Sequence, residues 1–196
     1  MVALDKPASI TYRWPRQGDW TYEAYARLPD NGWRYEVIQG ELHMSPAPSI
    51  AHQQTSIALA VALYNYVRQH NLGRVFEAPI DVILPDLATP VQPDIVLILA
   101  ANLDIVQKAN VRGAPDLVVE ILSPSTAAHD RHTKYGLYAE AGVTEYWIID
   151  PESCAADIYT RRGNAFVPLG HYERDGVLQS ELLPDLRLAM SELCTP

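Results

Sequence analysis

A glutamate lies inside one of the most apolar stretches of this 196-residue chain, the segment LVVEIL over residues 117–122. Side chains alternate between the two faces of a strand, so Glu120 is expected to share a face with Val118 and Leu122. An ionised carboxylate in that setting costs several kcal/mol unless it is paired or binds a cation. Glu120 is therefore either a structural residue near a strand end, salt-bridged to an arginine, or a ligand for a cation.

A second carboxylate, Asp94, follows a proline and begins another apolar run, DIVLIL. Pro-Asp dipeptides occur five times in the chain and most are typical of turns, but Asp94 differs because it heads an expected core strand. If that strand neighbours the strand of Glu120, the two carboxylates make a hard oxygen site suited to Mg²⁺ or Mn²⁺. Such an ion activates water and stabilises a phosphoryl transition state.

A lysine completes this group of chemically capable residues. Asp130 and Lys134 are four residues apart on an expected helix over 127–141, so they lie on one helix face. They either form an exposed ion pair, worth a few tenths of a kcal/mol, or serve the site on the preceding strand. In the second case the helix folds back on its strand and the Lys134 ammonium points toward Glu120, where it orients water or neutralises charge.

The elements around these residues predict one α/β domain with a mixed central sheet. Residues 1–18 lack periodicity and are interpreted as a loose leader, and a single domain is expected over 19–196. A helix over 52–70 is apolar nearly all round between positions 57 and 64, which predicts burial between two layers. The other expected elements are a helix over 22–28, a hairpin around Gln39-Gly40, strands over 74–84, 94–99, 117–122 and 145–150, and peripheral hairpins after Pro151.

Composition narrows the classes of function. No apolar run approaches the roughly 18–20 residues of a membrane span, and no signal peptide is evident, which predicts a soluble cytoplasmic protein. Phosphate-cradling, dinucleotide-binding and nucleophile-elbow glycine motifs are absent. The net charge of -9 argues against nucleic-acid binding by bulk attraction. Contact with nucleic acid therefore has to come from a local patch or from bound cations.

Three segments resemble the Uma2 family, also called DUF820. They are YEVIQGELHMSPAPSIAHQ, VQPDIVLI and the long run APDLVVEILSPSTAAHDRHTKYGLYAEAGVTEYWIIDPE, and the resemblance extends from Tyr35 to Pro151. That family is similar in fold to the PD-(D/E)XK restriction-endonuclease-like nucleases. The resemblance implies an α/β (α+β) fold, with a mixed central sheet flanked by helices and peripheral hairpins, and a metal-dependent nuclease site.

The resemblance also implies roles for individual residues. Asp94 falls on the aspartate of the Pro-Asp motif and Glu120 on the acidic member of the ExK element. Both would be Mg²⁺ ligands, with the Ile121 carbonyl as a further one. Glu36 falls on an acidic position that such folds often supply from their N-terminal part. His52 falls on the family's histidine at the start of the long helix and would contact substrate or a metal-bound water.

One position departs from the family pattern. The lysine of ExK is replaced by Leu122, which can neither orient water nor stabilise charge, and the resemblance implies that Lys134 replaces it from the following helix. The leading interpretation is a Mg²⁺-dependent DNA endonuclease. Leu122 and the acidic composition favour an alternative, a catalytically inactive nucleic-acid or protein interaction module. A hydrolase of small phosphate esters is a third interpretation that suits the acidic surface.

The expected partners follow from the leading interpretation. DNA phosphates would meet Arg131 and Lys134, on one helix, and Arg112. Endonucleases that cut both strands often dimerise, and a homodimer is expected. The aromatic residues of the C-terminal hairpins, Tyr159, Phe166 and Tyr172, form either its interface or part of the local core.

Overall fold

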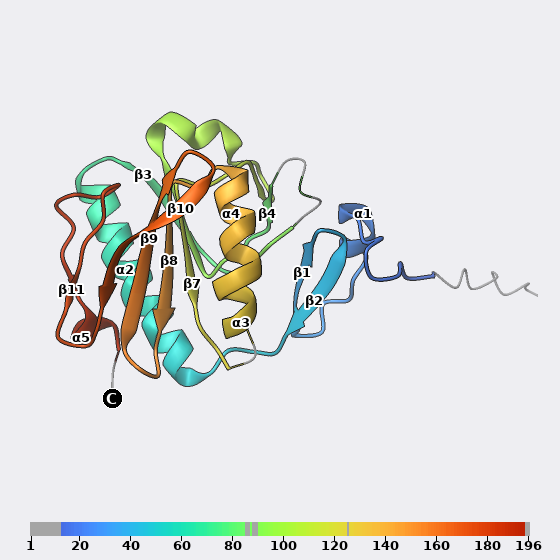
Figure 1. The fold of residues 1–196 in the computed structure, drawn as a ribbon. Helices are drawn as coiled ribbons and strands as arrows, with labels where there is room; N and C mark the ends of the chain where they lie inside the picture. The colour runs from blue at the N-terminus through green and yellow to red at the C-terminus, as the bar shows by residue number, and fades with distance from the viewer. Residues whose placement is uncertain (1–12, 85–86, 88–89, 125, 195–196) are drawn as a thin grey trace, which may run out of the picture.

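The computed structural model describes residues 13–84, 87, 90–124 and 126–194; residues 1–12 of the expected leader lie outside these ranges. Within them, six strands form a central sheet in the order β10-β9-β8-β7-β5-β3. The parallel pair β7–β8 stands among antiparallel pairs, which confirms the predicted mixed sheet (Figure 1). These strands are β3 (Gly73–Glu77), β5 (Ile95–Leu99), β7 (Leu117–Ile121), β8 (Glu145–Asp150), β9 (Ala155–Arg162) and β10 (Ala165–Tyr172).

Three two-stranded sheets accompany the central one. The predicted single strand over 74–84 is wrong, because β3 pairs with β5 while β4 pairs with β6. Pro79 lies between β3 and β4 and has no N–H to donate to a continuous ladder. The small sheets consist of β1 (Arg34–Ile38) with β2 (Glu41–Ser45), β4 (Val82–Ile83) with β6 (Val111–Arg112), and β11 (Val177–Leu178) with β12 (Leu188–Ala189).

The predicted helix over 127–141 is confirmed, but its middle is π-helical. It ends at Gly142, whose φ of 99° suits glycine because this residue has no Cβ. Single π-helical turns are rare in proteins, and those that do occur are frequently found at functional sites. The helical segments are α1 (Tyr22–Tyr25), α2 (Ile50–Gln69), η1 (Ala100–Ile105), α3 (Ala127–His129), the π-helical η2 (Asp130–Lys134), α4 (Tyr135–Ala141) and α5 (Met190–Leu193). No helix in the described part of the chain has the length and apolar character that crossing a membrane requires.

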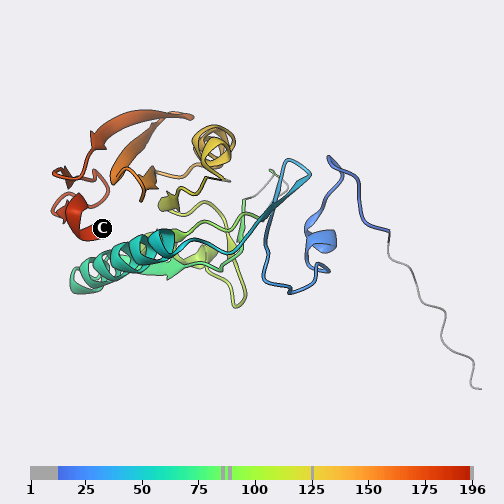
Figure 2. The same cartoon turned by 90° about the horizontal axis from the view of Figure 1, so that it is seen from below.

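Helices cover both faces of the central sheet (Figure 2). Alternate side chains of β5 face α2 on one side and α4 on the other, as the period of two in a strand requires. The first core cluster includes Leu59, Leu63, Ile95, Leu97 and Trp147, and the second includes Val96, Ile98, Leu137, Tyr138 and Tyr146.

The predicted burial of α2 on all sides is wrong. Leu59 and Leu63 are buried against the sheet, but Ile57, Val61 and Tyr64 are 59%, 52% and 50% exposed. The helix lies on the outside of the sheet, and none of the described elements forms a second layer over its outer face.

The C-terminal aromatic residues belong to the local core. Phe166 is buried in the second cluster, and Tyr159 packs against that cluster while Tyr172 packs against the first. Their strands β9 and β10 extend the central sheet, whereas β11 and β12 form a separate small sheet. Of the two alternatives for these residues, the structure favours the core.

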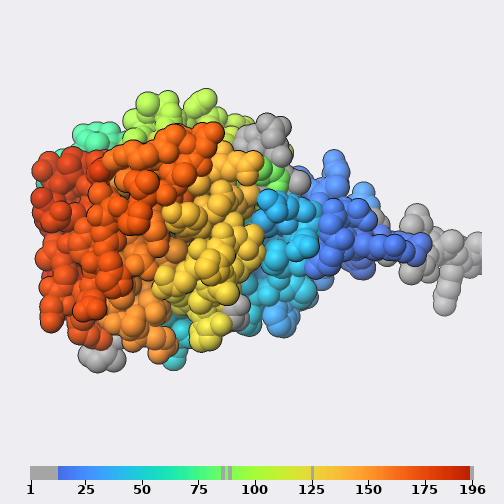
Figure 3. All heavy atoms as spheres, viewed as in Figure 1, coloured from blue at the N-terminus to red at the C-terminus, as the bar shows by residue number. Residues whose placement is uncertain are grey.

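The β1–β2 hairpin projects beside the body of the molecule together with α1 (Figure 3). Residues 17 and 18 of the expected leader hydrogen bond to it: the Gln17 side chain binds both polar groups of the Leu42 backbone, and the Gly18 N–H donates to the Gly40 carbonyl. The Val37 N–H donates to the Pro90 carbonyl and ties the hairpin to the body. These bonds hold one face of β1 over the end of the central sheet.

Candidate active site

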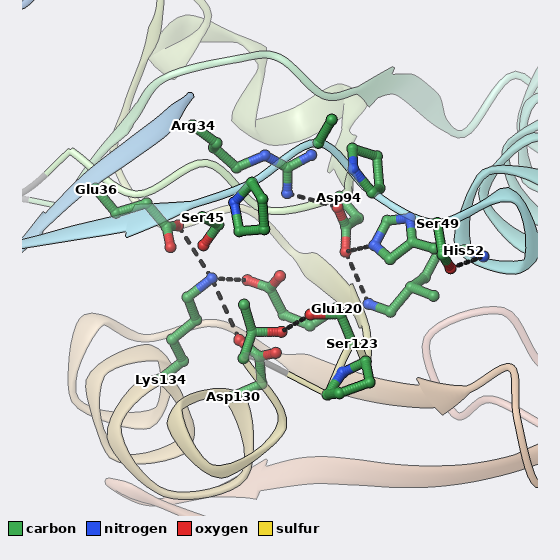
Figure 4. Close-up of a pocket in the computed structure, with 16 residues that line it drawn as sticks. Arg34, Glu36, Ser45, Ser49, His52, Asp94, Glu120, Ser123, Asp130 and Lys134 are labelled. Carbon is green, nitrogen blue, oxygen red and sulfur yellow. Dashed lines mark hydrogen bonds and ion pairs between the residues drawn. The ribbon is translucent and has the colours of Figure 1, made fainter. Parts of the chain in front are cut away.

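A cavity of about 280 Å³ lies where β1, the first turn of α2, the start of β5, the end of β7 and η2 meet (Figure 4). It brings together the residues that the sequence suggested for catalysis and metal binding. The residues Glu36, His52, Asp94, Glu120, Ile121 and Lys134 line it. They come from five different segments, so the tertiary structure assembles the site.

The Lys134 ammonium lies at the centre of a carboxylate cluster. Its Nζ is 3.0 Å from a Glu36 oxygen, 3.0 Å from a Glu120 oxygen and 3.4 Å from an Asp130 oxygen. The Tyr138 hydroxyl also donates to Glu120, at 2.7 Å. Every charged group in the cluster is buried, so it is a fixed array of charges and not the exposed ion pair that was the alternative.

Burial dominates the electrostatics of this cluster. It raises the pKa of Glu120 well above the ordinary value despite the Lys134 charge, and the neighbouring carboxylates Asp130, Asp94 and Glu36 raise it further. Burial likewise raises the pKa of Asp130. Burial alone would lower the pKa of Lys134, but the charges of Glu120, Glu36 and Asp130 outweigh it and raise that pKa. Three carboxyl groups thus share a single ammonium, so the cluster has fewer positive than acidic groups and favours a further cation.

Asp94 is held by three donors on the other side of the cavity. The Arg34 Nη1 donates to Oδ1 at 2.7 Å, the Ile121 N–H donates to Oδ2 at 2.8 Å, and the His52 Nε2 lies 3.1 Å from Oδ2. Burial raises the pKa of this carboxyl, but the hydrogen bond with His52 and the Arg34 charge outweigh it and lower the pKa to about 2. Asp94 is therefore ionised at neutral pH.

This network predicts how acid destabilises the protein. Because the folded-state pKa of Asp94 lies below its ordinary value, its contribution to the free energy of unfolding is full above about pH 4 and is lost as the pH falls toward 2. The lowering from 3.8 to about 2 corresponds to about 2 kcal/mol. We expect Asp94→Asn to lower the free energy of unfolding at neutral pH. The free energy of unfolding of the variant should also fall less steeply between pH 4 and pH 2 than that of wild type. Urea unfolding from pH 2 to 7 measures both, and parallel curves for the two proteins would contradict the assignment.

The two arginines that the sequence suggested for phosphate contact lie outside the cavity. Arg131 pairs with Asp157 at 2.7 Å and Arg112 lies over the Tyr22 ring, and neither lines the cavity, contrary to the expected phosphate contacts. Arg34 lines it instead. A signal for Arg34 was present, because it stands two residues before Glu36 and therefore shares its strand face.

The donor chemistry of the cavity fits Mg²⁺ or Mn²⁺. Carboxylate oxygens from Glu36, Asp94 and Glu120 are the hard ligands that these ions take. The described residues hold no preformed group of three or more acidic, histidine or cysteine ligands arranged around a metal position. Lys134 explains this, since its ammonium lies between the carboxylates of Glu36 and Glu120. Leu122, by contrast, packs into the second core cluster.

The fold of this chain is similar to that of a solved structure. A solved structure described as "a putative nuclease belonging to DUF820 from Anabaena variabilis ATCC 29413" superposes with a TM-score of 0.74 at 19% sequence identity. The match covers 89% of this chain and 97% of that chain, and at such low identity it shows the shared fold alone. No curated protein matches.

Comparison with protein-family models identifies the family as well as the fold. The model of the Uma2 family, described as "Putative restriction endonuclease", matches residues 22–191. This range includes all elements that line the cavity and most of the chain. The protein therefore belongs to the Uma2 family of nuclease-like proteins.

Proposed function

We propose that this protein is a Mg²⁺-dependent endonuclease that hydrolyses phosphodiester bonds in DNA. One observation carries the proposal: the Lys134 ammonium lies 3.0 Å from Glu120 in a cavity that also holds Glu36 and Asp94. Acidic oxygen donors suit a divalent ion that activates water, and a lysine beside them can stabilise the charge that develops on the phosphate. In this proposal Lys134 supplies the positive charge that the leucine at position 122 cannot supply.

Asp94 and Glu120 would hold Mg²⁺, or Mn²⁺ in its place, with the Ile121 carbonyl as a further ligand. When bound, the ion would supply an activated water and offset the charge that develops on the phosphate. Glu36 would complete the acidic set from β1. His52 and Arg34 would keep Asp94 ionised and oriented, through the contacts of 3.1 Å and 2.7 Å.

The protein's own cations would act on the phosphate. Lys134 is fixed by its carboxylate partners, so its charge is preorganised and would orient the attacking water or stabilise the developing negative charge. Arg34 is the more accessible of the two, with 25% of its side chain exposed, and would contact a nonbridging phosphate oxygen. Binding is then local and electrostatic despite the net charge of -9.

Plasmid nicking tests the proposal directly. Wild type should nick supercoiled DNA in Mg²⁺ or Mn²⁺ and not in EDTA, while Asp94→Asn should lose at least about 100-fold of the rate. Asp157→Asn is the matched control, since this carboxylate also pairs with an arginine but lies outside the cavity. Equal nicking by all three proteins, or none by wild type in either metal, would refute a nuclease site built on Asp94.

A further inference from the structure

The outer face of α2 carries a line of exposed apolar side chains. Ile57, Val61 and Tyr64 follow one another at intervals of four and three residues, and each is at least half exposed. Arg68 continues the line by one more turn and is exposed as well. Large contiguous apolar patches on a protein surface mark interaction sites, whereas single exposed apolar residues are ordinary.

The strand beside this line ends the central sheet. β3 pairs with β5 on one side, and among the described strands none pairs with its other side. The opposite edge strand, β10, carries Pro168 and an irregular register beyond it, both of which discourage further pairing. β3 has no proline, no lysine and no register shift against β5. The two edges therefore differ, and only β3 is suited to accept another strand.

The hydrogen bonds of β3 show which of its residues face outward. The Ala78 N–H donates to the Asp94 carbonyl and the Ala100 N–H donates to the Leu72 carbonyl, so the even-numbered residues bond to β5. The backbone groups of Gly73, Val75 and Glu77 then point away from the sheet. A second β3 can pair antiparallel in the register that places Val75 opposite its own copy, and Gly73 falls opposite Glu77.

Antiparallel pairing of two β3 strands creates a two-fold axis, and this axis also brings the outer faces of the two α2 helices together. Val61 and Tyr64 line one surface hollow together with Val75 and Glu77, so the exposed line and the strand edge form one continuous surface. A two-fold rotation about the Val75 pair places Glu77 of one copy opposite Gly73 of the other. Arg68 lies near Gly73, so Glu77 of one copy comes close to Arg68 of the other. The surface is thus complementary to itself, with apolar residues at its centre and opposite charges at its two ends.

We propose that a second copy of this chain docks on this surface. The two β3 strands pair antiparallel and join the central sheets, while the two α2 helices pack through Ile57, Val61 and Tyr64. Such an interface is isologous, because both copies contribute the same surface and each contact off the axis occurs twice. It lies away from the C-terminal hairpins and does not depend on the proposed nuclease activity.

Sedimentation velocity of the full chain across a range of concentrations tests the dimer. Wild type should sediment as a dimer, and Val61→Glu should shift it to monomer because two glutamates would face each other at the axis. Val167→Glu is the matched control, an exposed valine on the opposite edge strand, and should remain dimeric. Circular dichroism checks that each variant is folded. A monomeric wild type, or a dimer lost only in Val167→Glu, overturns the proposal.

Cross-linking tests the strand register separately. Hydrogen-bonded antiparallel partners have Cα atoms roughly 5.5 Å apart, which is within disulfide range. Val75→Cys should therefore give a covalent dimer on mild oxidation, and Val167→Cys should stay monomeric on a non-reducing gel. Both native cysteines are buried and give little background. A dimer that dissociates in Val61→Glu but does not cross-link through Val75→Cys overturns the strand pairing.

Discussion

Replacing Lys134 with methionine should abolish nicking and lower the free energy of unfolding at neutral pH by about 3–5 kcal/mol. The ammonium is the shared partner of Glu36, Glu120 and Asp130, all of which are buried. Methionine keeps most of the side-chain volume and removes the charge. The three carboxyl groups then remain in a low-dielectric site without their cation, which is the costly way to break a buried ion pair.

The loss of stability in Lys134→Met should depend on pH in a defined direction. Carboxyl groups with a raised folded-state pKa, here Glu120 and Asp130, destabilise the fold increasingly as the pH rises above their ordinary values. Without the lysine this trend should steepen, so the variant should be closer to wild type at pH 5 than at pH 8. Denaturant unfolding at both values measures it.

Lys108→Met is the control for this change, since Lys108 is exposed and lies outside the cavity. It should leave both nicking and stability unchanged. If Lys134→Met matched wild type in stability at pH 8, the carboxylates would not depend on the ammonium. If it nicked DNA at the wild-type rate, Lys134 would have no part in the chemistry.

The second large effect is expected for Glu120→Gln, which should weaken Mg²⁺ binding by at least about 100-fold while changing stability by less than about 1 kcal/mol. Glutamine retains an oxygen that can accept from Tyr138 and Lys134, now at 2.7 and 3.0 Å. Lys134 also keeps Glu36 and Asp130 as partners. The substitution removes one ion pair with Lys134, but it also removes repulsion between Glu120 and the neighbouring carboxylates, so the two effects on stability offset each other. A bound metal ion, by contrast, loses a charged ligand. Calorimetric titration with Mg²⁺ and Mn²⁺, with thermal unfolding beside it, measures both.

Glu145 offers a matched control on the neighbouring strand. It is also fully buried, but its carboxylate accepts from the Trp147 indole, the Ser180 hydroxyl and the Leu182 N–H, with no lysine among these donors. A glutamine there turns an N–H₂ group toward a donor, so Glu145→Gln should cost about 1–3 kcal/mol and leave Mg²⁺ binding intact. The opposite pattern, with Glu120→Gln unstable and its metal binding unchanged, would make Glu120 purely structural.

Much of the fold was predictable from the sequence because its signals are local. The runs that begin at Asp94 and Leu117 are apolar enough to indicate strands covered on both faces, and Gly142 marks a helix end through its conformational freedom. Failures arose where a local signal does not specify its surroundings. The apolar line at Ile57 and Val61 is the same in sequence whether another layer covers it or solvent does.

Residue types suited to the proposed chemistry can be recognised in the sequence. A carboxylate such as Glu120 in an apolar strand is costly enough to require a partner, and that cost is visible in six consecutive letters. Family resemblance then added Glu36 and His52, which no local pattern distinguishes. These are statements about residue type and immediate neighbours, and such statements need no knowledge of the distant chain.

How these residues come together depends on the packing of the whole fold. The hairpin packs against the end of the sheet, which brings Glu36 to 3.0 Å from Lys134 and Arg34 to 2.7 Å from Asp94. The π-helical turn that carries Lys134 likewise has no evident signal in its letters. Contacts between residues far apart in the chain depend on how whole elements pack, and that packing sums many weak interactions which no single segment encodes.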